Sequence, residues 1–229
     1  MLCRSHFFLS VSIFANVAHA CSPYGWIGEK WRKLGGVGSA LGNCLEDEKD
    51  DGARGRIQNF KNGFIDWDGH ANEAFEVRGL IGEKWSQVGL AKFGHPTTDE
   101  RGAPDGFGRY NYFVKNGAVS TIYFTPHSVF CPRITPCVPQ LVYGAILIEW
   151  GKQSYERGKL GYPTSDEEAK SGSGTVPGER ISNFEKGTIS WRPDGSILTK
   201  LFDDLCLTET GSYKSHDERN PPDKYCSSL

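Results

Sequence analysis

The chain lacks a strong excess of charge of either sign. Its 229 residues carry 26 Lys and Arg against 28 Asp and Glu. Surfaces that bind nucleic acid or anionic membranes normally show as a clear excess of basic residues. The sequence therefore predicts no nucleic-acid partner and no electrostatic attachment to a membrane.

Beyond its N-terminus, the sequence also lacks an apolar run long enough to cross a membrane. The apolar stretch 7–18 follows Arg4 and ends in Ala18-His19-Ala20. It is too short for a transmembrane helix, and its small residues suit cleavage by a signal peptidase after Ala20. We therefore predict a signal peptide, a secreted extracellular chain and no membrane insertion. Cys21 becomes the first mature residue, so a lipid anchor on Cys21 is the alternative to a free chain.

Familiar catalytic and metal-binding motifs are missing. No G-x-S-x-G, H-E-x-x-H or C-x-x-C pattern occurs. The acidic segments 46–51 and 66–69 hint at calcium but lack the ligand spacing of an EF-hand, so we expect solvated loops. The sequence predicts no metal, no cofactor and no identifiable catalytic residue. A glycosidase needs only two carboxylates in unlike environments, and 28 acidic residues leave that alternative open.

Seven cysteines occur, of which one, Cys3, lies in the predicted signal peptide. An even number then remains in a chain bound for an oxidising compartment, which favours disulfides over a metal site. A bond would close the short Pro-containing loop between Cys131 and Cys137, and another would hold the polar tail. The spacing therefore predicts three pairs: Cys21–Cys44, Cys131–Cys137 and Cys206–Cys226.

The most informative feature is a pattern that occurs three times. Each copy opens with an Ile and Trp segment, continues into a Gly turn with an acidic pair, and closes on an aromatic run. Self-similarity at this scale predicts one supersecondary unit used repeatedly, with each copy burying its apolar face against the next. The opening segments are Ile27–Trp31, Ile81–Trp85 and Ile146–Trp150, and the turns begin at Leu41, Phe93 and Leu160.

Each unit is expected to begin with a short amphipathic helix that buries its Trp in the core. Gly35 and Gly89 end the first two helices in this prediction. The T-x-x-E patterns at Thr97 and Thr164 resemble a capping box, which predicts a tight turn followed by a single turn of α-helix. A further helix is expected from Ile197 to Phe202 as a terminal cap.

Each unit closes in a predicted β-hairpin. In the first copy, strands over 56–60 and 64–67 flank Asn62-Gly63, a strong two-residue turn signal. The third copy repeats this with strands over 180–184 and 188–191 around Lys186-Gly187. Alternation along these strands places Ile65 with Trp67, and Ile189 with Trp191, on one face.

We therefore predict an α+β fold of three tandem helix–turn–β-hairpin repeats. The hairpins are expected to form a propeller-like, pseudo-symmetric β layer with helices between them, stabilised by disulfides. The predicted boundaries are a signal peptide over 1–20, repeats over 21–77, 78–141 and 142–195, and a C-terminal helix with a disulfide-tied tail over 196–229. The second repeat contains the Cys131–Cys137 insertion.

These motifs resemble the LGFP repeat over about Ile27 to Leu201. The resemblance rests on Leu160-Gly-Tyr-Pro-Thr-Ser-Asp-Glu167, on Asn183-Phe-Glu-Lys-Gly-Thr-Ile-Ser-Trp191 and on the Gly-Arg steps at Gly55 and Gly108. It implies secretion and binding to wall polysaccharide, because such repeats accompany mycolyltransferases and amidases of mycolate-bearing bacteria. The chain departs from the pattern in showing no catalytic domain beside its repeats. It also has Cys44 at the Pro position, which fits a turn adapted to a disulfide.

Recurring polar and aromatic residues form the candidate site. The acidic pairs and the following Arg of each repeat either clamp the turn, with Glu capping it and Asp pairing with Arg, or hydrogen-bond sugar hydroxyls. Trp67 and Trp191 either pack inward or stack on a pyranose. The recurring groups are Asp47, Glu48 and Arg56, then Asp99, Glu100 and Arg109, then Asp166, Glu167 and Arg180. The predicted ligand-binding set is Trp67, Asp99, Arg109, Asp166, Arg180 and Trp191.

The sequence thus predicts a secreted, non-catalytic module that binds cell-surface or cell-wall glycan. A small secreted glycoside hydrolase acting through paired Asp and Glu is the first alternative. A structural or effector protein that binds another protein is the second. No oligomeric state is predicted.

Overall fold

The structure is a computed structural model that describes residues 21–126, 137–202, 205–207 and 213–215. The predicted signal peptide lies outside these residues. So do Cys131 and Cys226, one partner in each of two predicted disulfides. Cys137 is disulfide-bonded. The third predicted pair, Cys21–Cys44, is confirmed, and its Cα atoms lie 6.1 Å apart.

Three antiparallel sheets make up the body of the molecule. The first sheet has the strand order β1-β2-β3-β4, the second β5-β7-β8-β9 with β6 beside β7, and the third β10-β11-β12-β13. The first part of the chain comprises α1 (Gly25–Lys33), η1 (Gly36–Gly38), β1 (Lys49–Asp50), β2 (Arg56–Phe60), β3 (Gly63–Trp67) and β4 (Phe75–Arg78).

The second and third parts repeat this order with small additions. The second comprises α2 (Gly79–Val88), α3 (Leu90–Phe93), β5 (His95–Pro96), β6 (Arg101–Gly102), β7 (Arg109–Lys115), β8 (Ala118–Phe124) and β9 (Gln140–Tyr143). The third comprises α4 (Gly144–Lys152), η2 (Tyr155–Arg157), β10 (Glu168–Ala169), β11 (Arg180–Phe184), β12 (Gly187–Trp191) and β13 (Ile197–Leu201). A separate pair follows, β14 (Leu205–Leu207) with β15 (Tyr213–Ser215).

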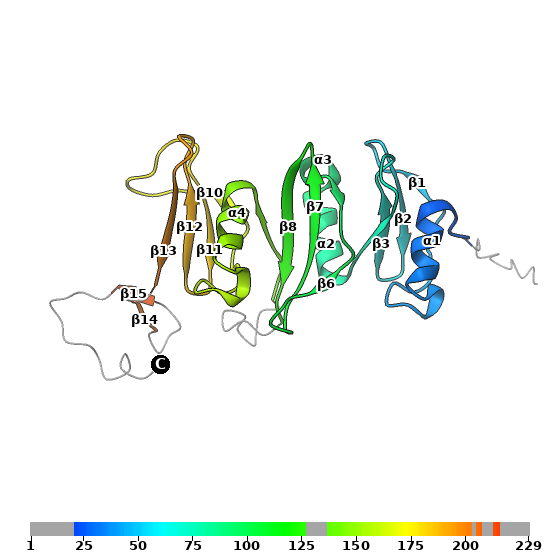
Figure 1. Ribbon diagram of the computed structural model, residues 1–229, viewed down its shortest axis with the longest axis horizontal. Coiled ribbons are helices and arrows are strands. Elements are labelled where there is room, and N and C mark those ends of the chain that lie inside the picture. Colours follow the sequence, from blue (N-terminus) through cyan, green and yellow to red (C-terminus); the bar gives the residue numbers. More distant parts are fainter. Residues whose placement is uncertain (1–20, 127–136, 203–204, 208–212, 216–229) are drawn as a thin grey trace, which may run out of the picture.

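The sheets follow one another in a row (Figure 1). Helix α1 covers the outer face of the first sheet, α2 lies between the first and second sheets, and α4 lies between the second and third. We call the packing around α2 the first junction and the packing around α4 the second junction. Each junction and the α1 face has its own buried hydrophobic cluster.

This row replaces the predicted propeller-like arrangement. No closed sheet exists among the described residues. The physical reason lies in β3, where Ile65 packs with Ile27 of α1 while the adjacent Phe64 packs with Ile81 of α2. A sheet that is apolar on both faces must be covered on both, and stacking helix and sheet alternately achieves this.

The predicted helix tryptophans behave as expected. Trp85 and Trp150 are buried, and Trp31 is half-buried against the α1 cluster. The indole N–H of Trp31 donates to the Gly42 carbonyl at 3.1 Å. Trp85 repeats the bond to Gly94 at 3.3 Å, so these two Trp residues tie their helices to the following Gly turns, whereas Trp150 Nε1 has no hydrogen-bond partner in the part of the chain that the structure describes.

Three local predictions are wrong. Residues 197–201 form strand β13 rather than a helix, paired along its whole length with β12. The T-x-x-E turns start no helix, since short strands follow the acidic pairs. The hairpin turns are one residue earlier than predicted, because Phe60 pairs with Gly63 and Phe184 pairs with Gly187. Gly35 and Gly89 do end their helices, with φ of 108° and 81°.

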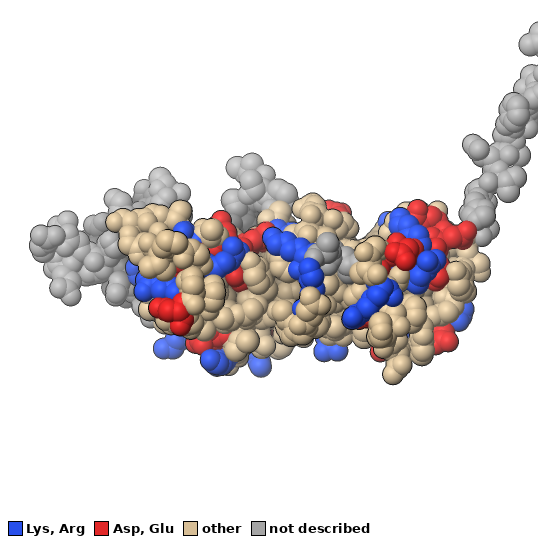
Figure 2. All heavy atoms as spheres, turned by 90° about the horizontal axis from the view of Figure 1, so that it is seen from above, with Lys and Arg blue, Asp and Glu red and all other residues tan. Residues whose placement is uncertain are grey.

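Charged residues of both signs lie close together on the face of the molecule drawn in Figure 2. In the described part of the chain, no helix has the length and apolar character that crossing a membrane requires.

Candidate functional site

The recurring Glu and Arg side chains bind one another within each repeat. Each Arg starts the long hairpin, and each Glu directly precedes the short strand that pairs with it, so the two are diagonal neighbours on one face. The predicted pairing of Arg with Asp is therefore wrong. Burial raises the pKa of Glu167, and the hydrogen bond from Arg180 opposes this rise. The Nε to Oε1 distances are 3.0 Å for Arg56–Glu48, 2.8 Å for Arg109–Glu100 and 3.1 Å for Arg180–Glu167.

The recurring Asp instead reaches back to the preceding repeat. Asp99 Oδ1 accepts the backbone N–H of Glu76 at 2.9 Å, and its Oδ2 lies 2.9 Å from Lys30 Nζ. Asp166 repeats both contacts, with the backbone N–H of Leu141 at 2.8 Å and with the ammonium of Lys84. Each Asp therefore fixes a helix and a last strand of one repeat to the turn of the next.

Trp67 and Trp191 are half-buried and lie on the helix-facing sides of their sheets. Trp67 packs against the α1 cluster, and its indole N–H donates to the Ala71 carbonyl at 2.8 Å. Trp191 packs against the α4 cluster. The six predicted ligand-binding residues are thus distributed over all three sheets and take part in internal packing or pairing.

A groove beside α1 presents a different aromatic side chain. Trp26 is 40% exposed, whereas the other five Trp residues are buried or half-buried. The groove has a volume of about 300 Å³. Its lining consists of Trp26, Glu29, Lys30 and Lys33 from α1, with Asn72, Glu73 and Ala74 from the segment between β3 and β4.

Charged groups line this groove in fixed positions. Lys30 is 3% exposed, and its Nζ lies 2.7 Å from Glu73 Oε1. Lys33 Nζ approaches the same oxygen at 3.3 Å. The hydrogen bond from Lys30 lowers the pKa of Glu73, so this carboxylate stays ionised beside the indole. The groove thus combines an exposed aromatic face with a held carboxylate and ammonium groups.

Sequence reasoning missed Trp26, although a signal was present. The helices share their Gly, Ile and Trp positions, yet Trp26 is replaced by Leu80 in α2 and by Ala145 in α4. Because Trp26 is exposed, packing in the core does not explain why the first copy has a Trp at this position. The difference between the three copies was therefore the signal in the sequence.

Comparison with protein-family models agrees with the repeat pattern. A model described as LGFP repeat matches three consecutive segments, over residues 41–92, 93–158 and 160–198. Together they cover more than half of the chain. The chain belongs to the LGFP repeat family. Among curated proteins, none matches it significantly.

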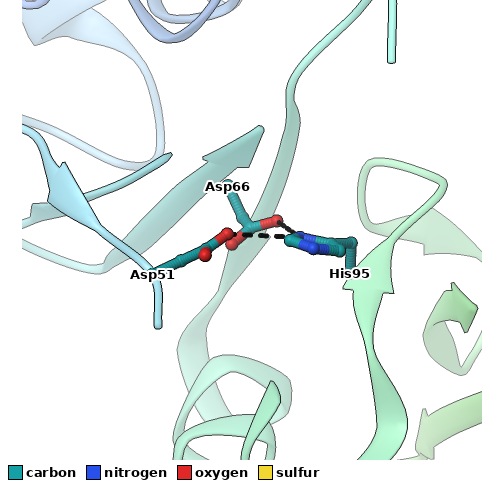
Figure 3. A group of neighbouring side chains, drawn as sticks. All are labelled: Asp51, Asp66 and His95. Carbon is teal, nitrogen blue, oxygen red and sulfur yellow. Dashed lines mark hydrogen bonds and ion pairs between the residues drawn. The ribbon is translucent and has the colours of Figure 1, made fainter. Parts of the chain in front are cut away.

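One further polar cluster lies between the first two LGFP repeats (Figure 3). Asp66 on β3, Asp51 after β1 and His95 on β5 point toward one another. His95 Nδ1 lies 2.7 Å from Asp66 Oδ1 and 3.5 Å from Asp51 Oδ2. The side chain of His95 is 8% exposed, that of Asp66 0% and that of Asp51 1%. The prediction of solvated acidic loops is therefore wrong at these two aspartates.

The cluster attracts positive charge. Burial raises the pKa of Asp66 above its usual value, although the hydrogen bond to His95 opposes this. Burial lowers the pKa of His95, but the hydrogen bond to Asp66 and the charges of Asp66, Asp51 and Asp68 outweigh it and leave the pKa raised. Both shifts favour binding of a proton, as expected where two carboxylates share one imidazole. Within the described residues these three side chains are positioned to hold a metal ion.

Proposed function

We propose that this LGFP-repeat chain is a secreted glycan-binding protein, and that the groove beside α1 binds a sugar unit of a cell-surface or cell-wall polysaccharide. The observation that carries the proposal is the exposed indole of Trp26 above a polar groove. An aromatic face stacks against the apolar C–H face of a pyranose, while carboxylate and ammonium groups bind its hydroxyls.

The polar side chains of the groove suit a neutral sugar. Glu73 supplies acceptor oxygens, and Lys33 supplies donors at the exposed rim. Lys30 Nζ is already engaged by Glu73 and Asp99, so it orients Glu73 rather than contacting the ligand. The ion pair with the buried Lys30 holds Glu73 in place, so this carboxylate loses little side-chain entropy on binding.

Secretion is part of the proposal. It is supported by the predicted signal peptide and by the Cys21–Cys44 bond, which joins the first residue after the predicted cleavage site to the turn of the first repeat. Disulfides persist in oxidising compartments outside the cytosol.

Retention of the mature chain on insoluble wall polysaccharide tests the proposal. Trp26→Leu introduces the residue that α2 has at this position, so the helix should be retained while the indole is lost. We expect affinity to fall by about tenfold, the value of one aromatic stacking contact. The matched control is Leu80→Ala, an exposed substitution on α2 that should leave retention unchanged.

Two outcomes would overturn the proposal: no retention of the unaltered chain on any wall preparation, or equal retention of Trp26→Leu. Released oligosaccharide products would favour the hydrolase alternative instead. Retention that depends on wall protein rather than polysaccharide would favour the protein-binding alternative.

A further inference from the structure

The first junction buries two carboxylates and an imidazole at positions where the second junction has neither kind of group. Asp66 pairs across its hairpin with Ile57, and Tyr123 pairs in the same way with Tyr110, so Asp66 and Tyr123 are equivalent. His95 and Tyr162 are each the third residue of a matched repeat segment. Asp51 and Ala103 each lie four residues after the Asp of the acidic pair.

The three equivalents in the second junction include neither a carboxylate nor an imidazole. Ala103, Tyr123 and Tyr162 belong to one buried cluster, and the two tyrosine rings pack edge to face with centroids 6.3 Å apart. The repeat can therefore close this part of a junction with two tyrosines, whose hydroxyls donate to Asp105 and Glu156. The two carboxylates and the imidazole of the first junction are thus not required at these positions by the architecture.

The trio also leaves hydrogen-bonding capacity unused. Asp51 Oδ1 accepts the backbone N–H groups of Ala53 and Gly55. Its Oδ2 has no hydrogen-bond partner, and neither does Asp66 Oδ2, although both are buried. Buried carboxylate oxygens without partners are costly, so two of them beside one imidazole indicate a missing positively charged group.

We propose that Asp51, Asp66 and His95 bind a divalent transition-metal ion of the zinc class. The 3.5 Å separation between His95 Nδ1 and Asp51 Oδ2 is close to the roughly 3.3 Å expected between ligand atoms of a tetrahedral zinc ion. The 2.7 Å contact between His95 and Asp66 is a hydrogen bond, which the ion would replace. A nitrogen ligand with two carboxylates suits Zn²⁺ better than Ca²⁺ or Mg²⁺, which prefer oxygen ligands throughout. With a neutral imidazole, the two carboxylates balance the charge of the ion.

The ion would join two repeats. Asp66 belongs to the first sheet, Asp51 directly follows strand β1 of that sheet, and His95 belongs to the second sheet, so one ion crosslinks the first junction. Binding to the folded chain stabilises it by mass action. Three protein ligands leave a fourth position for water or another small ligand. The ligands come from three separate segments of the chain, which explains why no linear metal motif predicts this site.

Zinc titration of the metal-stripped mature chain tests this inference. We expect one bound Zn²⁺ per chain, measured with a competing chromophoric chelator, and a rise in melting temperature that Ca²⁺ and Mg²⁺ do not produce. A triple variant with Asp51→Ala, Asp66→Tyr and His95→Tyr places the residues of the second junction at these three positions. It should fold and lose the zinc-dependent rise.

Asp66→Asn is the conservative second variant, because it keeps the side-chain shape and removes one ligand charge. Its zinc affinity should fall at least tenfold, as for ligand-sphere changes in general. His70→Ala, which alters an exposed histidine nearby in the chain, is the matched control and should bind as the unaltered chain does. No zinc binding by the unaltered chain, or undiminished binding by Asp66→Asn and the triple variant, would overturn the proposal.

Discussion

At the scale of single residues, the acidic side chains form two groups. One group links parts of the repeats through ion pairs and hydrogen bonds, and the other has pKa values raised by burial. In the second and third repeats, Glu of the acidic pair binds Arg inside its own repeat, and Asp binds the preceding repeat. These structural contacts account for both acidic pairs without invoking ligand binding.

Asp166→Ala tests the contact between repeats. The substitution leaves the Leu141 N–H without its acceptor and Lys84 without its ion-pair partner. We expect the free energy of unfolding to fall by about 2 kcal/mol in urea denaturation. Glu168→Ala, an exposed acidic residue two positions later, is the control and should change it by less than about 0.5 kcal/mol. Equal effects of both substitutions would contradict this assignment.

Glu76 provides a pH-dependent prediction. Burial raises its pKa to about 7, and its Oε2 has no hydrogen-bond partner. Between about pH 4.5 and 7 the folded chain keeps a proton that the unfolded chain releases, so this residue makes stability fall as pH rises through that range. The full loss is roughly 3 kcal/mol.

Glu76→Gln should remove this loss, because an amide carries no ionisable proton. The variant should match the unaltered chain near pH 4 and exceed it in stability near pH 8, measured by urea denaturation across the range. Glu83→Gln, on the exposed face of α2, controls for a general effect of charge removal. Parallel stability curves for Glu76→Gln and the unaltered chain would rule out a raised pKa.

At the scale of elements, the sequence was most reliable where its pattern is long and repeated. The three helices, the packing of their tryptophans against the core and the long hairpins were predicted from spacing alone. Strand β13 was missed because Ile197, Leu198 and Leu201 fit helical spacing over a window too short to separate helix from strand. Its alternating burial, with Leu198 exposed between Ile197 and Thr199, emerges only once the strand is paired with β12.

The candidate sites were less predictable than the elements. Trp26 lies on a predicted helix, but its exposure depends on what packs beside α1. The Asp51, Asp66 and His95 cluster joins two sheets, so no local spacing encodes it. The acidic turn was correctly identified as a turn, yet its partners depend on strand register. The features that the sequence did not predict are therefore mostly contacts between repeats.

At the scale of the whole molecule, the structure is a linear stack of sheets. The outer face of its last sheet differs in polarity from the corresponding faces inside the stack. Phe64 and Val77 lie on the face of the first sheet that α2 covers. The equivalent strand positions in the third sheet hold Thr188 and Lys200, which are polar. A polar outer face is what terminal repeats require for solubility. The sheet itself, rather than the predicted fourth helix, provides it among the described residues.

In a linear stack, a destabilising substitution in one junction should affect mainly the two sheets that meet there. Trp85 contacts Phe64 of the first sheet and Phe113 of the second, with ring centroids 4.5 Å and 6.3 Å away. Trp85→Ala should cost about 3–5 kcal/mol locally. Hydrogen exchange should then quicken in β3 and β8 much more than in β12. Trp150→Ala should shift the effect to β8 and β12, and uniform loss of protection in both variants would contradict a nearest-neighbour stack.

The proposal that the α1 groove binds glycan is tested most directly by following the tryptophan indole signals during a titration. The six indole N–H groups give separate resonances in ¹⁵N-labelled protein, and soluble wall oligosaccharide is added in steps. We predict that the Trp26 signal shifts with saturation, while those of Trp31, Trp67 and Trp85, whose N–H groups donate to backbone carbonyls, stay in place. Saturable shifts confined to other tryptophans, or none at any concentration, would contradict the proposed site.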